Sequence, residues 1–511
     1  MKCRSRRRLS QPACTELLRA PLARNLVWLG LACMPAVAQD ATVSRPYYLV
    51  PTFNASAQLI DVRNKTGSTE PAELVMQLGP GLQMSKQSGR VQGTLDYQLL
   101  GNIHTRRSEL NKLDNNLSAA ARAEAVPGWM YVDAKAHVSK QTLNALGQQS
   151  ASGSLATNSN QREVLNVQVS PYVRGELPEL AQYELRLRGA VTEVRGSSFG
   201  DSNTLGSSVS LSSLRRGTVL GWGLQASQDR LDYKGGRATD NARASVSVSA
   251  TPDPDLSVEL RAGQESTNVS SLTQRTYDNY GAALRWSPSP RTLLSVAADR
   301  RYFGDSFQVT AEHRLRQSAF RFTSTRDAST SGDVPQTLFQ WYDQAYKSTY
   351  PDPIQRAQLV IQYLLSTNQN PFAVTGGSFA TSAVTLQRRD DLSYSYLTPR
   401  STFTVRAYFG TTELLDNLSA QRDIGRIEQQ GLEASVAHKL TPTTSATLLG
   451  SLQKNSAQGQ ADSDLKSLSL NLTTAVNRNT TASAGARYGV YGGASNSNRE
   501  IALTGSLSMR F

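Results

Sequence analysis

The chain has 511 residues, a formal net charge of +13 at pH 7 and a mean hydropathy of −0.40. A length like this ordinarily predicts several soluble domains, and a basic balance suggests nucleic acid as a partner. Export, which the N-terminal segment predicts, separates the chain from nucleic acid and removes part of the charge, so the sequence argues against that class of partner.

The first 38 residues have the pattern of a secretory signal peptide. Seven Lys and Arg residues precede an apolar run that begins at Leu26, and Ala36 and Ala38 supply the small residues of a cleavage site. Cleavage after Ala38 removes seven basic residues and one acidic residue, which lowers the net charge to +7 and leaves residues 39–511. All three cysteines go with the signal, so we expect an exported protein that is stable without disulfides.

From Tyr47 onward, apolar and polar residues alternate with a period of two. In YELRLR (183–188), the apolar Tyr and Leu residues alternate with Glu and Arg. The same pattern runs through LSVELRAGQE (256–265), FTVRAYF (403–409) and LSLNLTTAV (468–476). Strict alternation predicts β-strands with one apolar and one polar face.

About 22 such segments are present, and their connections fall into two classes. Those after even-numbered segments are short, as in SPSPR (287–291) and TPTT (441–444), whereas most after odd-numbered segments are longer and polar, as in 139–161. Short turns at one end and long loops at the other are typical of a membrane β-barrel whose short turns lie in the periplasm. The predicted segments begin near Tyr47, Leu74, Val91, Leu113, Trp129, Arg162, Leu180, Leu205, Val219, Ala242, Leu256, Tyr277, Arg291, Ser306, Ala319, Leu392, Thr402, Ile427, Thr443, Leu465, Thr480 and Glu500.

The predicted fold class is therefore all-β: a transmembrane up-and-down antiparallel β-barrel of about 22 strands over 39–511, with one partly helical insertion. An exported soluble sandwich or solenoid is the alternative. It would need a larger core of Leu, Ile, Val and Phe than the sparse apolar rows provide, and it would expose edge strands that a closed barrel removes.

Residues 329–390 interrupt the alternation. Asp352 can cap a helix and Pro353 can open it, and apolar residues then follow at helical spacing from Ile354 to Leu365. Because this stretch follows the fifteenth segment, it lies either outside the cell or inside the barrel lumen. It is accordingly either a helical hairpin that caps a loop or a plug.

The free-energy cost of Arg or Lys at the lipid midplane, about 2–4 kcal/mol, assigns the charged rows to the lumen. We predict a lumen of mixed charge, with aromatic girdles at the two membrane interfaces. The charged side chains predicted to face the lumen are those of Glu184, Arg186, Arg188, Glu259, Arg261, Asp299, Arg301, Glu312, Arg314 and Arg406. The aromatic residues expected at the interfaces are Tyr47, Tyr48, Trp129, Tyr131, Trp222, Trp286 and Tyr302.

The chain ends in REIALTGSLSMRF (499–511), where every second residue from Ile501 to Phe511 forms one largely apolar row. This pattern predicts a last strand that closes the ring against the first. A terminal apolar row ending in Phe511 also resembles the signal that the barrel-assembly machinery reads in many bacterial barrels.

The sequence offers little for catalysis. There are four histidines, and His313 follows Glu312, so an outer-membrane hydrolase with His313 or His137 as base is an alternative, although no motif fixes a nucleophile. We find no Cys or His cluster at metal spacing and no P-loop, so no cofactor or metal is expected. The first strand begins too soon after the signal for a globular plug domain of the kind that TonB-dependent receptors carry.

Several stretches resemble a family of outer-membrane β-barrel proteins associated with PEP-CTERM/exosortase systems and encoded near exopolysaccharide loci in Gram-negative bacteria. They are QLGPGLQMSKQSGRVQGTLDYQLLGNIH (77–104), VSPYVRGEL (169–177), SPSPRTLLSVAADRRYFGDSFQVTAEHRLRQSAFRFTSTRD (287–327), PDPIQRA (351–357), AGARYGVYG (484–492) and SLSMRF (506–511). The resemblance implies a location in the cell outer membrane of a Gram-negative bacterium and a link to exopolysaccharide. Members are generally uncharacterised, so it implies no catalytic residue.

Three functions follow as expectations. The first is a non-enzymatic barrel that serves export of exopolysaccharide or PEP-CTERM proteins and their surface sorting, as a pore or a scaffold. The second is an outer-membrane hydrolase acting on lipid or glycan. The third is a surface adhesin or receptor that uses the long loops. The expected partners are outer-membrane lipid, the barrel-assembly machinery, and exopolysaccharide or its export apparatus.

Overall fold

The computed structural model describes residues 47–64, 71–197, 200–214, 219–330, 336–347, 349–375, 379, 381–415, 425–493 and 497–511. The expected signal peptide (1–38), with Ala36 and Ala38, lies outside these residues. The chain from Arg45 to Phe511 is one compact unit. Within the described ranges, no helix has the length and apolar character needed to cross a membrane.

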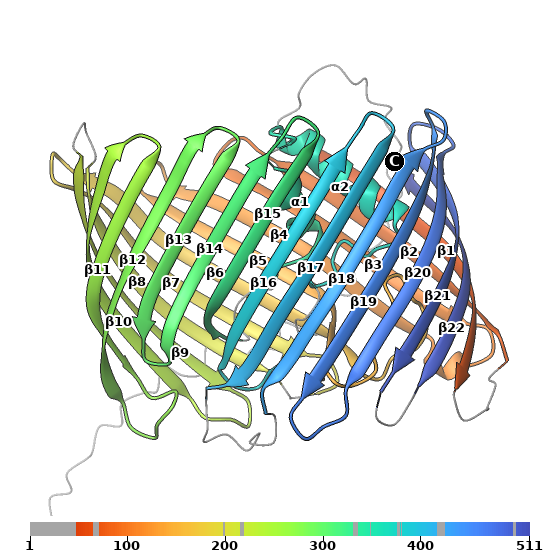
Figure 1. Cartoon of the computed structure of the whole chain (residues 1–511), viewed down its shortest axis with the longest axis horizontal. Coiled ribbons are helices and arrows are strands. Elements are labelled where there is room, and N and C mark those ends of the chain that lie inside the picture. The colour runs from red at the N-terminus through yellow and green to blue at the C-terminus, as the bar shows by residue number, and fades with distance from the viewer. Residues whose placement is uncertain are drawn as a thin grey trace, which may run out of the picture. The chain divides into compact units, whose positions relative to one another are not determined.

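The described residues form 22 strands in a single sheet, and neighbours in the chain pair antiparallel (Figure 1). The strands are β1 (Tyr47–Asn64), β2 (Glu73–Lys86), β3 (Val91–His104), β4 (Lys112–Val126), β5 (Met130–Thr142), β6 (Gln161–Leu177), β7 (Ala181–Val194), β8 (Ser202–Ser213), β9 (Leu220–Tyr233), β10 (Thr239–Asp253), β11 (Leu256–Thr267), β12 (Arg275–Ser289), β13 (Thr292–Arg301), β14 (Gly304–Arg314), β15 (Ser318–Ser329), β16 (Thr385–Leu397), β17 (Ser401–Leu414), β18 (Ile427–Lys439), β19 (Thr444–Ala457), β20 (Ser463–Ala475), β21 (Thr480–Gly492) and β22 (Asn498–Arg510). The helices are the 3-10 turn η1 (Ser108–Leu110), α1 (Leu338–Tyr346) and α2 (Pro353–Ser366).

The sheet closes because β22 pairs with β1 over a continuous register, from Thr52 opposite Arg510 to Asn64 opposite Asn498. The N–H of Phe511 donates to the carbonyl oxygen of Pro51 at 2.9 Å and extends this ladder by one residue. Closure pairs both edges of every described strand, as a barrel in lipid requires. The predicted fold class, a transmembrane up-and-down antiparallel barrel of 22 strands, is confirmed.

The two ends of the barrel differ in the length of their connections. At one end the connections have two to six residues, and we call this end the short-turn side. At the other end, the long-loop side, they reach 18 residues between β5 and β6 and 55 residues between β15 and β16. Tyr47 and Phe511 both lie on the short-turn side, as the even number of strands dictates.

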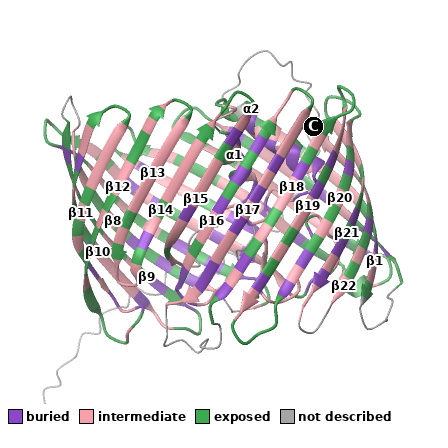
Figure 2. Cartoon of the chain, in the orientation of Figure 1, coloured by how far each residue is buried: buried purple, intermediate pink, exposed green. Residues whose placement is uncertain are grey.

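Along the strands, exposed residues alternate with less exposed ones (Figure 2), and large apolar residues recur on the exposed row while polar residues recur on the other. On β22 the outward Leu503 is 56% exposed, whereas its inward neighbour Ala502 is fully buried. Outward leucines exposed to this degree recur on other strands, among them Leu187 on β7 and Leu260 on β11. An exposed apolar surface of this extent is expected where lipid covers the wall.

Two of the aromatic residues expected at the membrane interfaces lie elsewhere. Tyr131 stacks on Tyr172 with ring centroids 5.3 Å apart, and both side chains are buried. Tyr302 packs against the buried cluster of Leu231 and Tyr233. Tyr131 faces inward because it shares its row with Asp133 on β5.

One strand begins earlier than the sequence predicted. β16 starts at Thr385, seven residues before Leu392, so residues 385–390 belong to the wall rather than to the insertion. The charges at 388–391 hid the alternation in the sequence. Arg389 pairs with Asp391 on the inward row, while Arg388 pairs with Asp390 on the other, so both rows carry charge next to each other.

The connection between β15 and β16 holds the two α-helices. In α1, Thr337 and Gln340 form a capping box with both hydrogen bonds at 3.1 Å. α2 begins at Pro353, and the carbonyl oxygen of Asp352 accepts a hydrogen bond from the N–H of Arg356. The helix predicted from Asp352 and Pro353 is therefore present at the expected position.

Candidate functional site

The two helices of the insertion, α1 and α2, lie inside the barrel lumen (Figure 1). The insertion enters from the long-loop side, yet the hydroxyl of Tyr346 is 3.2 Å from that of Thr404, the fourth residue of β17 from the short-turn side. The hydroxyl of Tyr363 is 2.6 Å from that of Ser435, the fifth residue of β18 from the short-turn side. The helices therefore extend through the lumen toward the short-turn side.

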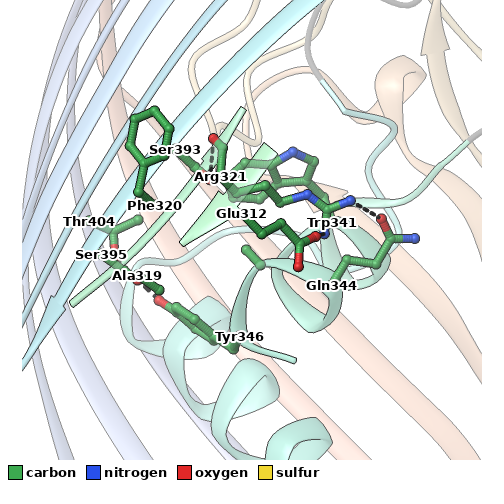
Figure 3. A pocket seen from close by; sticks show the side chains of 11 residues that line it. Glu312, Ala319, Phe320, Arg321, Trp341, Gln344, Tyr346, Ser393, Ser395 and Thr404 are labelled. Carbon is green, nitrogen blue, oxygen red and sulfur yellow. Dashed lines mark hydrogen bonds and ion pairs between the residues drawn. The ribbon is translucent and has the colours of Figure 1, made fainter. Parts of the chain in front are cut away.

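Helix α1 packs tightly on the inner wall (Figure 3). Gln344 accepts a hydrogen bond from Arg321 of β15 at 3.4 Å, and Arg321 pairs with Glu312 of β14 at 3.4 Å. The space left along this seam, with Trp341 and Tyr346 at its lining, is about 10 Å³. That volume holds about one water molecule, so the seam is a packing contact rather than a passage.

Arg406 of β17 is the strongest anchor of α1. Its guanidinium lies 4.3 Å from the ring centroid of Trp341, 2.8 Å from Asp391 and 3.8 Å from Glu433. The residue is 2% exposed. A buried charge is tolerated when it is paired, and an aromatic face adds a further attraction. The anchor thus joins the wall to the insertion through charge and ring together.

The insertion has a small core of its own. Leu338, Tyr342, Val360 and Leu364 are buried together between α1 and α2. Arg356 pairs with Asp343 at 2.7 Å and ties the two helices to each other. Because these contacts lie within the insertion, the helical pair is a folded unit seated on the wall.

A second segment, the 143–160 loop between β5 and β6, also folds into the lumen. Gln58 of β1 donates to the carbonyl oxygen of Gly153 at 3.2 Å and accepts from the N–H of Leu155 at 3.0 Å. Asn455 of β19 donates to the carbonyl oxygen of Ala145 at 2.8 Å. The loop therefore starts beside β5 and is fixed to β1 and, beyond the β22–β1 closure, to β19.

The two inward segments meet in the lumen. Gly153 has φ +71°, and a Cβ at this position would lie 2.3 Å from the carbonyl oxygen of Asn368. Thr142 at the end of β5 forms a parallel bridge with Phe379 of the insertion. We call the 143–160 loop together with the described part of 336–375 the luminal constriction.

The ten charged residues predicted to face the lumen lie on the rows that alternate with the exposed apolar residues of their strands. Nine of them take part in ion pairs among the described contacts, which are Glu184–Arg186, Arg188–Asp229, Arg261–Glu259, Arg261–Asp299, Arg301–Glu265, Arg321–Glu312 and Arg406–Asp391. We call the inward rows of β4–β17 the charged wall. The side chain of Asp229 is 41% exposed, so part of this wall is open to solvent in the lumen.

The inward rows of β19–β22 and β1–β3 differ in chemistry, and we call them the neutral wall. Most of their residues are Ser, Thr, Asn and Gln, and the ion pair of Arg487 with Glu500 is one of few charged features. Between this wall and the constriction lies a cavity of about 440 Å³. Its lining includes Asn54, Ser56, Gln98, Ser451, Thr481 and Ser506.

The anchors of the constriction were not found from the sequence. Gln58, Asn455 and Ser435 belong to alternating rows in which amide and hydroxyl residues are common, so nothing in the pattern marks them. Trp341 stands out only as a tryptophan within the insertion. A possible signal was the single Arg406 on an otherwise uncharged inward row of the FTVRAYF segment.

The structure places the two proposed catalytic bases, His313 and His137, in different surroundings. His313 and Glu312 are neighbours on a strand and therefore lie on opposite faces. The Nδ1 atom of His313 is 3.0 Å from the hydroxyl of Thr292. His137 does contact a serine, Ser139, at 2.9 Å, but both are buried, at 1% and 0% exposure. Among the described residues, no group of three or more His, Cys, Asp or Glu side chains could hold a metal ion.

No family model matches the chain, and no curated protein matches it. Solved structures that resemble it include OpdO of Pseudomonas aeruginosa, with 11% identity, 91% of this chain and 97% of that chain covered, and a TM-score of 0.33. The siderophore receptor PirA of Acinetobacter baumannii has 10% identity, coverage of 90% and 80%, and a TM-score of 0.45. OmpT with loop L8 deleted, an outer membrane protein of Vibrio cholerae, has 8% identity, coverage of 91% and 100%, and a TM-score of 0.28. Likenesses of this strength carry no functional information.

Proposed function

We propose that the chain is a non-enzymatic β-barrel of the outer membrane of a Gram-negative bacterium and that its lumen is a constricted, water-filled passage. The observation that carries this proposal is the luminal constriction itself. Two segments from the long-loop side are bonded to the inner wall, and they leave solvent-exposed ion pairs and a polar cavity beside them. A structure built only to hold neighbours in the membrane would not need this arrangement.

The sequence resemblance supports a role for the passage in export of exopolysaccharide or of PEP-CTERM proteins and in their sorting at the surface. A barrel that exports a hydrated polymer needs a polar inner wall and a means of restricting leakage. The two walls and the constriction meet both requirements. Loss of surface exopolysaccharide in a deletion strain, restored by the intact gene, is the expected result that checks this link.

The two alternatives find less support. A hydrolase with His137 as base would need an accessible nucleophile, and Ser139 is completely buried. A receptor that binds through the helical insertion would need that insertion outside the barrel, whereas its tyrosines contact the wall near the short-turn side. The remaining long loops could still bind a surface partner, but no geometry among the described residues favours this.

Single-channel conductance in planar bilayers tests the passage. We compare the intact chain with a variant in which 336–375 is replaced by a short Gly-Ser linker. The intact barrel is expected to conduct, and removal of the insertion to raise the conductance several-fold because it widens the narrowest part of the lumen. Shortening the exposed β19–β20 connection (458–462) is the control and should leave conductance unchanged. A barrel that is silent in both forms would contradict the passage and leave only a scaffold.

A further inference from the structure

The cavity beside the neutral wall extends over much of the barrel height. Its lining includes Thr473 and Ser508, each the third residue from the short-turn end of its strand. At its other end it reaches Gln149 of the 143–160 loop. A volume of about 440 Å³ lies within the range of small-molecule sites, roughly 300–1,000 Å³. The cavity is therefore large enough to hold part of a chain-like ligand against the wall.

Three buried polar groups at this cavity have no hydrogen-bond partner among the described residues. They are Nδ2 of Asn116, Nε2 of Gln141 and Oγ1 of Thr473. A buried polar group left without a partner costs about 1–3 kcal/mol. The two amide NH2 groups can only donate hydrogen bonds, and the hydroxyl can donate or accept. A ligand rich in hydroxyl and ether oxygens therefore supplies hydrogen-bond partners for all three.

The charges at the cavity cancel. Lys140 is 2.7 Å from Asp114, and Arg406 is paired with Asp391 and Glu433. A charged ligand entering this cavity would lose hydration without meeting an unpaired opposite charge. An uncharged ligand does not have this cost, so the site discriminates against charge.

The wall also disfavours a peptide. Extended peptides commonly bind by adding a strand to an open sheet edge, and the closed ladder from β1 to β22 has no such edge among the described strands. Besides aliphatic side chains and the paired charges, the lining offers a ligand side-chain amides and hydroxyls, together with the rings of Tyr408 and Phe379. Hydroxyls that both donate and accept, next to flat rings that can cover C–H faces, match a sugar.

We propose that this cavity is a binding site for an uncharged, hydroxyl-rich oligosaccharide, with Asn116, Gln141 and Thr473 as hydrogen-bonding residues. The inference rests on the proposed passage and names its substrate class. In it, the neutral wall, together with Asn116 and Gln141 on the adjoining strands β4 and β5, holds successive sugar units while the constriction limits the free cross-section.

Calorimetric titration of the full chain in lipid nanodiscs tests the site. The probes are maltohexaose, which is neutral, hexagalacturonate, which is anionic, and the glucosamine hexamer, which is cationic. Maltohexaose should bind at least tenfold more tightly than either charged hexamer. Asn116→Leu combined with Thr473→Val should weaken maltohexaose binding at least tenfold without lowering the unfolding temperature, because the groups removed bond to nothing in the described protein.

Thr204→Val is the matched control. Thr204 is a buried threonine on the charged wall whose hydroxyl also has no partner among the described residues, and it does not line the cavity. Its replacement should leave maltohexaose affinity unchanged. Equal affinity for the three hexamers, tighter binding of a neutral Gly-Ser hexapeptide, or an unaffected double variant would each overturn the site. A conducting barrel that binds no maltohexaose refutes the site alone, whereas a silent barrel that binds it refutes the passage alone.

Discussion

The charged wall and the neutral wall share one strand pattern and differ in what the inward row carries. On the charged wall, carboxylates and guanidinium groups neutralise one another across strands, as in Arg261 with Asp299 at 2.7 Å. On the neutral wall, hydroxyls bond across strands instead, as in Ser483 with Ser506 at 2.6 Å. The apolar exterior is common to both. Alternation therefore fixes the barrel, while the chemistry of the inward residues fixes what the lumen can hold.

The walls also hold the two parts of the constriction by different interactions. The helical insertion is fixed to the charged wall and to β18 by Arg406, Arg321 and Ser435. The 143–160 loop is fixed to the neutral wall mainly by amides, among them Gln58 and Asn455. Removing one partner of a buried ion pair costs several kcal/mol of stability, about 3–5 kcal/mol, because it leaves the other charge buried alone. A single neutral hydrogen bond contributes about 1 kcal/mol to stability. We therefore expect the insertion to be the more firmly held of the two.

Arg406→Ala should have the largest effect. It leaves Glu433 without its cation and the buried Asp391 with Arg389 alone among the described ion pairs, which costs about 3 kcal/mol, and it removes the contact with Trp341. Hydrogen exchange of the α1 and α2 amides measures the loss, and protection there should fall by at least a hundredfold. Arg300→Ala, which breaks an exposed ion pair with Asp305, is the control and should leave that protection unchanged. Equal effects of the two substitutions would show that Arg406 does not anchor the insertion.

The second-largest effect is expected at high pH, which should weaken the contact of the helical insertion with the wall. Burial raises the pKa of Tyr363 to about 12, and it also raises the pKa of Tyr342 and Tyr346. The state in which the helical insertion is docked on the wall favours neutral tyrosine side chains. The tyrosines therefore contribute their full stabilisation of docking below pH 10, the ordinary pKa of tyrosine, and this stabilisation declines as the pH rises from 10 to 12. For Tyr363 the loss reaches about 3 kcal/mol above pH 12. Amide hydrogen exchange of α2 should accelerate between pH 10 and 12 as the insertion detaches from the wall. Absorbance at 295 nm should show the tyrosines ionising over the same pH range.

Tyr363→Phe provides the comparison for the pH experiment. It removes the titrating hydroxyl and with it the contact to Ser435, so docking becomes weaker at neutral pH by about 1 kcal/mol but less sensitive to pH above 10. Release of the insertion already below pH 9, or an unchanged pH dependence in this variant, would contradict the assigned role of Tyr363.

Gly153→Ala should have the smallest effect, at the contact between the two inward segments. A residue with a Cβ at φ +71° costs about 1–2 kcal/mol, and this Cβ would also approach the Asn368 carbonyl too closely. Gly235 has a similar φ of +78°, and a Cβ there would have nothing within 4 Å. Gly235→Ala therefore shows the effect of the positive φ alone, without a contact to another segment. Single-channel conductance should change for Gly153→Ala and stay constant for Gly235→Ala. Identical traces for both would mean that the contact does not shape the passage.

The wall was predictable from the sequence because its pattern is local. Every predicted strand start lies within three residues of the observed one except that of β16, where charges on both rows at 388–391 concealed the period. Parity placed the helical insertion on the long-loop side but could not choose between lumen and exterior. That choice depends on Arg406 and Ser435, which are distant from the insertion in sequence.

The inward fold of the 143–160 loop had no sequence signal. Its residues are mostly Asn, Gln, Ser, Gly and Ala, a composition that suits a solvent-exposed loop. A water-facing lumen offers such a loop the same partners as bulk solvent does, plus amides on the wall. Composition therefore cannot separate the two placements, and only the contacts of Gln58, Arg487 and Asn455 do so.

The account depends most on one claim, that apolar rows face lipid and polar rows face a water-filled lumen. Residues 39–511 contain no cysteine, so single cysteines can be placed without background. Ser506 and Leu503 both lie on β22. Ser506 lines the luminal cavity, whereas Leu503 does not line it and is 56% exposed on the exterior row. In liposomes, a water-soluble maleimide should label Ser506→Cys and spare Leu503→Cys. Labelling of Leu503→Cys with Ser506→Cys protected would contradict the account.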